Sequence, residues 1–384
     1  MTTIIFKAIE KCIANCVYCE VIKRKQNIVM SYELLEIIFD RINEFLEANP
    51  QENIDFTWHG GEITMLGVDY FNKVLEIQEK CCKNTKIRIK HLAQSNLLKI
   101  SQEIIDVFNK LGITSIGSSY DPISNIRGLG KNRNSLKYNT LFFHGIELLN
   151  KNKIPFGIIN VVHKKQLENP LSIYYFLSNM VDNFAFNKVY FFSEDRYGLN
   201  VTQEEYADFL GAIFPIWLKQ RDRYHVRPFE SFYDIIIKNK GDLVCENAGL
   251  CAYRWLYIGP EGNTSHCGRS GDNEMLSYGN IKKRKLNDIL HDTQRSQIEK
   301  RQDVLISTEC KGCRFWGLCH GGCMIDAYDI HHDFIHKSPN CEWLKIFIEK
   351  YFEPILNVKL DLTSDKEYTN LMRCTTNKNK IICE

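Results

Sequence analysis

The chain has 384 residues, of which 44% are hydrophobic and 25% are charged, and its formal net charge is +2. This length and composition are typical of a globular protein with two domains, or with one large barrel and a smaller module. There is no long basic stripe and no apolar run of the roughly 18 residues that a membrane span needs. No apolar signal segment precedes Cys12, so we expect a cytoplasmic protein with neither a nucleic-acid nor a membrane partner.

The 15 cysteines are not scattered along the chain. In a reducing compartment this number indicates metal ligands rather than disulfides. Three lie within 12–19 and eight between 245 and 341. We interpret Cys81 and Cys82 as packing cysteines of a helix, and Cys374 and Cys383 as thiols of a polar tail.

Between residues 3 and 195, short apolar runs alternate with longer helical periodicities. Strands are expected at Ile4–Ile9, Ile54–Trp58, Ile87–Gln94, Ile113–Ser119, Phe156–Val162 and Lys188–Phe192. Helices are expected near 31–48, 67–84, 101–111, 137–152 and 168–181. Six βα-like units in series predict parallel strands with right-handed crossovers. The predicted fold is therefore α/β, a partial (β/α)6 TIM-like barrel with its chemistry at the carboxyl ends of the strands.

The composition changes again after the barrel. Residues 200–244 have helical spacing, and residues from 245 to 341 are rich in glycine and cysteine. We expect a barrel with a helical connector over 1–240, a cysteine-rich domain over 241–352 that ends in a helix at 342–352, and a polar tail over 353–384.

Directly after the first expected strand, Cys12, Cys16 and Cys19 form a C-x3-C-x2-C array. Three thiolates on one loop can ligate three irons of a [4Fe–4S] cluster and leave the fourth iron open for a small molecule. Structural zinc is the alternative, but such a site usually has a fourth Cys or His nearby. The 35 residues after Cys19 contain neither.

This array, with Tyr18 before its last cysteine, resembles that of the radical S-adenosylmethionine (SAM) enzymes. In that family the open iron binds SAM and cleaves it to a 5′-deoxyadenosyl radical. The ends of later strands also resemble elements of the family. One is a Gly-Gly-Glu turn that binds the SAM amino group in the family, and here Ile63 replaces the proline that usually follows it. The others are the Q-[ST]-N and S-x-D elements, which meet the ribose and the carboxylate of SAM. The implied SAM-binding residues are Tyr18, Gly60, Gly61, Glu62, Gln94, Asn96, Ser119, Asp121 and Arg127.

Taken singly, these residues have ordinary structural alternatives. A Gly-Gly-acid sequence is often only a tight turn, polar side chains at strand ends often cap loops, and an arginine can form a solvated salt bridge. Arg127 is expected to pair with the methionyl carboxylate because guanidinium can bind it in a bidentate manner. Their position at consecutive strand ends favours function.

The eight cysteines between residues 245 and 341 are enough for two fully ligated four-iron clusters, although zinc ribbons also use paired cysteines. Their order resembles the SPASM extension of peptide-modifying radical SAM enzymes, as does Gly279-Asn280-Ile281. The resemblance implies two interleaved auxiliary clusters. The first would be held by Cys245, Cys251, Cys267 and Cys323, and the second by Cys310, Cys313, Cys319 and Cys341. The expected cofactors are SAM and three [4Fe–4S] clusters.

Enzymes of this family act mainly on side chains of peptides or proteins. In the sulfatase-maturase branch an aspartate follows the cysteine that matches Cys267, whereas this chain has Gly268. We therefore expect a maturase that installs an oxidative cross-link, either cyclophane-type or thioether, in a ribosomally made precursor peptide, with the auxiliary clusters relaying the second electron. Oxidation of Cys or Ser to formylglycine is the alternative. A non-catalytic multi-cluster electron carrier and a zinc-structured binding module are alternatives of other classes.

If a proton leaves the substrate, a base is required. Glu194, Asp195 and His163 follow expected strands and are candidates, although each is equally suited to a solvated loop or a capped turn. The expected partners are the precursor peptide and an electron donor of the flavodoxin or ferredoxin type. No peptide-recognition domain fits before Cys12, so leader recognition is expected from a separate protein, or from the SPASM region and tail by strand addition.

Overall fold

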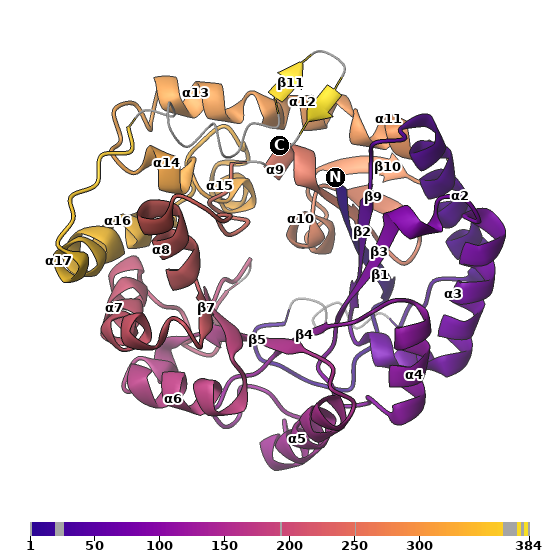
Figure 1. The fold of residues 1–384 in the computed structure, drawn as a ribbon, viewed down its shortest axis with the longest axis horizontal. Helices are drawn as coiled ribbons and strands as arrows, with labels where there is room; N and C mark the ends of the chain where they lie inside the picture. Colours follow the sequence, from indigo (N-terminus) through magenta and orange to yellow (C-terminus); the bar gives the residue numbers. More distant parts are fainter. Residues whose placement is uncertain are drawn as a thin grey trace. The chain divides into compact units, whose positions relative to one another are not determined.

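A computed structural model describes residues 2–19, 27–192, 194–249, 251–363, 375–377 and 380–382. The chain divides into two compact units, shown in Figure 1. The first comprises Met1–Val201 and Ala252–Gln297, and the second comprises Thr202–Cys251 and Ile298–Glu384. Residues 255–280 add strands to the sheet of the first unit, and the domain boundaries expected after residues 240 and 352 stay a prediction.

The first unit is built on a parallel sheet in which β1 to β6 pair in chain order. The strands are β1 (Thr2–Ile9), β2 (Ile54–Gly60), β3 (Ile89–Gln94), β4 (Ile116–Ser119), β5 (Phe156–Val162) and β6 (Asn183–Lys188). The helices between them are α2 (Tyr32–Ala48), α3 (Gly67–Cys81), α4 (Gln102–Lys110), α5 (Ser135–Lys151) and α6 (Pro170–Met180). Short helical turns lie at η1 (Ile63–Leu66), η2 (Lys86–Arg88) and η3 (Lys164–Gln166). The predicted α/β fold of successive βα units is confirmed.

The prediction for the sixth strand was wrong. We expected Lys188–Phe192, whereas β6 spans Asn183–Lys188. Phe184 and Phe186 occupy alternate positions of β6 and are buried, which is the period-two pattern of a strand with one covered face. The denser apolar run that suggested the strand comes after the end of β6.

Strands from the last third of the chain complete the sheet. The strand β8 (Trp255–Ile258) pairs in parallel with β1 on the edge opposite β2, in the register Thr3 to Trp255. The strands β9 (Asn263–Ser265) and β10 (Ser277–Asn280) follow in antiparallel order. Between them lies the short helix α10 (Gly268–Asp272), and α11 (Leu286–Leu290) follows. The sequence analysis did not predict these strands.

The two faces of the sheet differ in character. On one face, Phe6 of β1 and Trp58 of β2 have ring centroids 4.9 Å apart, and Trp58 packs against Phe71 of α3 at 5.2 Å. This face is therefore covered by the helices α2, α3 and α4, which Figure 1 shows in indigo and purple. Because side chains alternate along a strand, Lys7 and His59 point to the opposite, inner face.

The second unit is mainly helical. Its helices are α7 (Gln203–Gln220), α8 (Phe229–Lys238), α13 (Arg301–Ser307), α14 (Trp316–Cys319), α15 (Met324–His331), α16 (Cys341–Phe347) and α17 (Glu353–Leu356). Phe214 packs against Phe229 and Phe347 with centroid distances of 5.6 and 5.5 Å. The last helix, expected at 342–352, is observed as α16 and the wide turn η4 (Ile348–Phe352).

The remaining elements are α9 (Cys251–Arg254), α12 (Thr293–Glu299), the strand β7 (His225–Arg227), and the antiparallel pair β11 (Thr375–Asn377) and β12 (Lys380–Ile382). Cys374 and Cys383 lie outside the described residues. In the part of the chain that the structure describes, no helix is both long and apolar enough to cross a membrane.

Candidate active site

The three-cysteine loop follows β1 and is held against the segment after β4. The backbone N–H of Asn15 donates to the carbonyl of Gly128 over 2.8 Å, and that of Val17 donates to Ile126 over 3.0 Å. Burial, with a smaller contribution from the nearby Cys19, raises the pKa of Cys12 and of Cys16 to about 12. Buried thiolates that repel one another are stable only beside cations, so this donor set fits an iron–sulfur cluster.

The Gly60-Gly61-Glu62 turn at the end of β2 packs against the end of β1. The N–H of Gly61 donates to the carbonyl of Ile9 over 2.8 Å, and that of Glu62 donates to Lys11 over 3.0 Å. A side chain at position 61 would overlap the backbone here, since its Cβ would lie 2.3 Å from the carbonyl oxygen of Lys11. The close approach of the two strand ends therefore requires glycine.

The carboxylate of Glu62 is buried and fixed by hydrogen bonds. Its Oε1 accepts from the backbone N–H of Thr64 at 3.0 Å, from the Thr64 hydroxyl at 2.8 Å and from the Ser95 hydroxyl at 2.7 Å. Its Oε2 accepts from the backbone N–H of Asn96 at 2.6 Å. Burial raises the pKa of Glu62, whereas these hydrogen bonds lower it. The turn thus presents a rigid acidic group beside the cysteine loop.

Asn96 joins this acidic turn to the cysteines. Its side-chain Nδ2 donates to Sγ of Cys12 over 3.4 Å, while its backbone N–H contacts Glu62. Gln94, the last residue of β3, lies close to β4, since a Cβ at Gly117 would be 2.0 Å from Nε2 of Gln94. Ser119 is the last residue of β4. The strand-end residues predicted for SAM binding therefore lie on the neighbouring strands β2, β3 and β4.

Tyr18, Asp121 and Arg127 form a buried cluster. The guanidinium Nε of Arg127 donates to Oδ2 of Asp121 over 2.7 Å, and the Tyr18 hydroxyl contacts both side chains. The other oxygen of Asp121 accepts from Nδ2 of Asn160 at 3.1 Å and from the backbone of Val161 at 2.8 Å. Arg127 is thus already paired with Asp121, and its predicted contact with a methionyl carboxylate stays a prediction.

The candidate bases differ in their surroundings. His163 follows β5 and is fully buried, and among the described residues neither ring nitrogen has a hydrogen-bond partner. Burial lowers its pKa. Asp195 accepts from the backbone N–H of Tyr197 and Asn200 at 3.2 and 2.7 Å and so caps an exposed turn, and the exposed Glu194 pairs with Arg196. Their role as bases stays a prediction.

In the second unit, Cys310, Cys313, Cys319 and Cys341 are brought together. Burial, together with the neighbouring thiolates of the set, raises the pKa of Cys310 to about 11 and that of Cys319 to about 12. A loop closed by a hydrogen bond of 3.1 Å from Cys313 to Cys310 presents the first two. These four are the predicted ligands of the second auxiliary cluster, and their proximity fits that role.

Arg301 is a site residue that the sequence analysis missed. It is buried, and it donates to the carbonyls of Phe334, Gly321 and His336 at 2.6, 2.9 and 2.8 Å. It also donates to the carbonyl of His320 at 3.2 Å. Burial lowers its pKa, which the nearby thiolates of Cys323, Cys251, Cys319 and Cys310 raise. It lies in a charged, helical stretch of sequence, so nothing in the pattern distinguishes it from a surface arginine.

Comparison with known proteins agrees with this architecture. The SPASM model, described as an iron-sulfur cluster-binding domain, matches residues 250–314. The serine-type anaerobic sulfatase-maturating enzyme of Bacteroides thetaiotaomicron is 23% identical over 94% of this chain and 92% of its own length. The cysteine-type enzyme of Clostridium perfringens (strain ATCC 13124) is 24% identical over 93% of this chain and 98% of its own length.

Solved structures give the same result. The structure of anSMEcpe with bound AdoMet and the Cp18Cys peptide matches with a TM-score of 0.78 at 22% identity, over 93% of this chain and 98% of that one. Streptococcus suis SuiB bound to its precursor peptide SuiA matches with a TM-score of 0.58 at 15% identity, over 88% and 75%. The chain thus matches a SPASM iron-sulfur cluster-binding domain over residues 250–314, is similar to sulfatase-maturating enzymes over most of its length, and shares the fold of the AdoMet-bound anSMEcpe structure.

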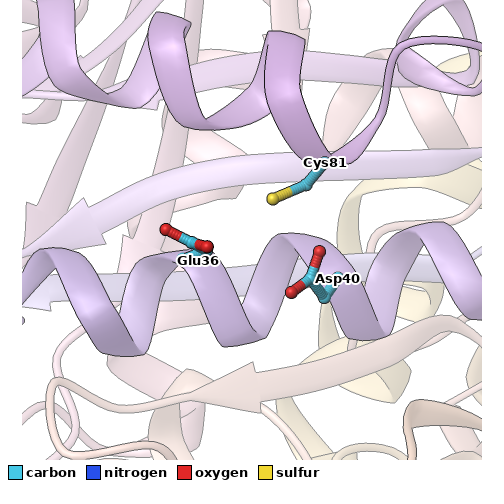
Figure 2. A group of neighbouring side chains, drawn as sticks. All are labelled: Glu36, Asp40 and Cys81. Carbon is cyan, nitrogen blue, oxygen red and sulfur yellow. The ribbon is translucent and has the colours of Figure 1, made fainter.

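A second group of potential ligands lies away from the strand ends. Figure 2 shows Glu36 and Asp40 on α2 and Cys81 on α3, with ligand atoms within 4.8 Å of one another. The ammonium of Lys80 already pairs with Glu36, and burial and the Asp40 carboxylate raise the pKa of Cys81 to about 12. We assign this group to the contact between the two helices, because the ion pair with Lys80 already neutralises part of its charge.

The assignment of the first auxiliary cluster stays a prediction. Cys245, Cys251 and Cys323 belong to the second compact unit, whereas Cys267 belongs to the first. None of the described cysteines forms a disulfide.

Proposed function

We propose that this enzyme binds a [4Fe–4S] cluster through Cys12, Cys16 and Cys19, binds SAM beside it, and oxidises a side chain of a peptide or protein. The observation that carries the proposal is the hydrogen-bonded chain from Cys12 through Asn96 to Glu62. It places the cysteine loop and the acidic turn of the neighbouring strand in one rigid assembly. When bound, the cluster and SAM would supply a 5′-deoxyadenosyl radical as the acceptor of a substrate hydrogen atom.

The rest of the proposed SAM site consists of the ends of β3 and β4 and the buried Tyr18, Asp121 and Arg127 cluster. Gln94 and Ser119 are only partly buried, so their polar groups are accessible for a ligand. The Arg127–Asp121 ion pair would hold Tyr18 and the cysteine loop in position. Rigid support of this kind keeps a reactive group close to its target and excludes water.

We also propose that the cysteines of the C-terminal region hold two auxiliary clusters, giving three clusters in total. The close set of Cys310, Cys313, Cys319 and Cys341 supports one of them. With four thiolates each, such clusters have no open iron, which favours a role in electron relay. A flavodoxin- or ferredoxin-type protein is the proposed electron donor.

For the reaction, conversion of Cys or Ser to formylglycine is the better supported of the two oxidations. The similarity to serine-type and cysteine-type sulfatase-maturating enzymes extends over more than 90% of both chains. This reverses the order that the sequence favoured. A cross-link in a precursor peptide is the second candidate, because Gly268 lacks the carboxylate that the resemblance associates with formylglycine formation. Both candidate reactions are two-electron oxidations of a peptide side chain.

The test is anaerobic reconstitution with iron and sulfide, followed by incubation with SAM, dithionite and one of two peptides. One peptide carries the Cys or Ser segment of a sulfatase, and the other is a precursor peptide encoded near the gene. Mass spectrometry follows 5′-deoxyadenosine and the peptide, and a hydrazide probe detects aldehydes. An aldehyde supports formylglycine formation, whereas loss of two hydrogens without an aldehyde supports a cross-link.

A matched control separates the enzyme from an electron carrier. Cys16→Ala removes one proposed ligand of the N-terminal cluster and should abolish deoxyadenosine formation. If the fully iron-loaded wild-type chain forms no deoxyadenosine with either peptide, the proposed activity is refuted and the electron-carrier alternative is favoured.

A further inference from the structure

An ionic group on the inner face of the sheet is not explained by the functions proposed so far. The ammonium of Lys7 lies 2.6 Å from Oδ1 of Asp272 and 3.2 Å from a carboxylate oxygen of Glu10. The Lys7 side chain is only 1% exposed. A buried charge is costly unless it is paired, so this arrangement needs a specific reason.

The imidazole of His59 belongs to the same group. Lys7 and His59 are direct partners in the parallel register of β1 and β2, and both point to the inner face. His59 is half-buried and immediately precedes the Gly60-Gly61-Glu62 turn. Its charged surroundings are Asp272 from α10 and Lys7 from β1, while the next strand, β3, ends in the neutral Gln94. His59 therefore stands beside the proposed SAM site.

The helix α10 brings the carboxylate of Asp272 close to Lys7 of β1. A Cβ at Gly268, the first residue of α10, would lie 3.5 Å from Cγ2 of Ile5. Asp272 is one helical turn later and contacts Lys7, which is two residues after Ile5 on β1. Asp272, the only acidic residue of α10, therefore contacts β1 nearer to the carboxyl end of that strand than Gly268 does.

We propose that His59, supported by Asp272, accepts the proton that the substrate releases when it is oxidised, and that Lys7 is a positioning residue which holds Asp272. This inference rests on the proposed function, because it assigns the base of that reaction. It differs from the sequence-based candidates, of which Asp195 caps a turn and Glu194 is exposed.

The balance of the reaction defines the role of His59. Oxidation of a Cys or Ser side chain removes two hydrogens: the Cβ–H bond breaks with loss of a hydrogen atom, and the S–H or O–H bond breaks with loss of a proton. When bound, SAM and oxidised iron–sulfur clusters would supply the acceptors of the hydrogen atom and of the remaining electron. The proton goes to the imidazole of His59, and the carbon–sulfur or carbon–oxygen double bond forms.

The charges around His59 suit this role. Burial lowers its pKa, Asp272 raises it, and Lys7 lowers it. The imidazole is therefore neutral at neutral pH and ready to accept a proton, and Asp272 stabilises the imidazolium that forms. Product formation should be lost as the pH falls through the pKa of His59, because the protonated ring cannot act as a base.

The first test compares His59→Gln with His144→Gln in the reconstituted full-length enzyme. His144 is an exposed histidine of α5 whose Nδ1 lies 3.8 Å from the Glu147 carboxylate, so it is a histidine–carboxylate pair away from the strand ends. His59→Gln should still bind SAM but form oxidised peptide at least about 100-fold more slowly. His144→Gln should match the wild type. A His59→Gln enzyme with wild-type rate and pH profile would overturn the proposal.

The second test does not depend on how well His59→Gln folds. Diethyl pyrocarbonate acylates a histidine only in its neutral form. The rate at which His59 is acylated, measured by peptide mapping at several pH values, therefore reports the pKa of His59. Asp272→Asn should lower that pKa, and the inflection in the pH profile of product formation should move to lower pH by the same amount. An unchanged pKa, or an inflection that does not follow it, would refute the proposal.

These outcomes are distinguishable from failure of the proposed function. Absence of deoxyadenosine from the wild type refutes the radical reaction, and with it the need for a base. The acylation measurement needs no substrate and still reports whether Asp272 and His59 are coupled. If Asp272→Asn abolishes product formation while the pKa of His59 is unchanged, Asp272 itself is the proton acceptor and the assignment to His59 is wrong.

Discussion

Asn96 donates a hydrogen bond from its side-chain Nδ2 to Sγ of Cys12 over 3.4 Å, while its backbone N–H holds the carboxylate of Glu62 at 2.6 Å. Hydrogen bonds to cluster sulfurs stabilise the more negative, reduced state and so raise the reduction potential. We expect Asn96→Leu, which removes the donor but keeps the size, to lower the midpoint potential of the N-terminal cluster.

The measurement is a redox titration followed by electron paramagnetic resonance on the reconstituted enzyme. Asn109→Leu, at an exposed position of α4, is the control and should leave the potential unchanged. Equal potentials in wild type and Asn96→Leu would show that this hydrogen bond does not reach the cluster.

Gly61 should tolerate no side chain. A Cβ there would lie 2.3 Å from the carbonyl oxygen of Lys11 and 2.5 Å from that of Glu10, and both are backbone atoms that cannot move freely. We expect Gly61→Ala to lower the free energy of unfolding by about 1–3 kcal/mol, and to weaken SAM binding because the acidic turn is displaced. Denaturant unfolding and equilibrium dialysis with SAM measure the two effects.

Gly268→Ala is the matched control for that substitution. A Cβ at Gly268 meets only Cγ2 of Ile5 at an ordinary contact distance of 3.5 Å. Its stability and its SAM affinity should therefore match the wild type. Equal SAM affinity in Gly61→Ala would contradict the role of the turn.

His91 should make stability depend on pH. Its Nδ1 accepts from the indole N–H of Trp58 at 3.0 Å, and its Nε2 lies 2.8 Å from the amide nitrogen of Gln78. Burial lowers the pKa of His91 from 6.5 to about 4. The unfolded chain therefore binds more protons between these values, and stability falls as the pH falls from 6.5 to about 4.

The loss over this range is at most about 3 kcal/mol. Urea unfolding at several pH values measures it, and His91→Gln should have a smaller pH dependence than the wild type, whatever its absolute stability. His144→Gln should keep the wild-type dependence. The same slope in His91→Gln and the wild type would show that His91 is not the group responsible.

Arg301 should be essential to the second unit. Its guanidinium donates to the carbonyls of Phe334, His320, Gly321 and His336, which would lose their donor in Arg301→Leu. Buried acceptors without a donor cost about 1–3 kcal/mol each. We expect lower stability and a lower iron content per chain after reconstitution, whereas Lys300→Leu at the exposed neighbouring position should retain both. A full complement of iron in Arg301→Leu would argue against this role.

Local patterns explain which parts of the structure were predictable. The strand Phe156–Val162 has the predicted bounds because its buried residues alternate, and Pro155 and His163 mark its two ends. The cysteine spacing and the Gly-Gly-Glu turn were predictable for the same reason, because each is a pattern of a few neighbouring residues. In contrast, β6 was misplaced because the run that follows it is more apolar than the strand itself.

Features that depend on distant parts of the chain were not predictable from one sequence. The ion pair between Lys7 and Asp272 joins residues separated by 265 positions. The pairing of β1 with β8 and the carbonyl contacts of Arg301 likewise arise only when the chain is folded. Neither hydrophobic period nor motif spacing carries information about such contacts.

The pairing of β1 with β8 also has a consequence for how the protein is made. The first strand to leave the ribosome is flanked on one side by β2, but its other edge is not covered until residues 255–258 have been synthesised. A nascent chain with an open strand edge next to three reactive cysteines is prone to aggregation. A fragment that ends at residue 240 would keep this edge open permanently, so we expect it to be recovered mainly in inclusion bodies, whereas a fragment that ends after β10 should close the sheet.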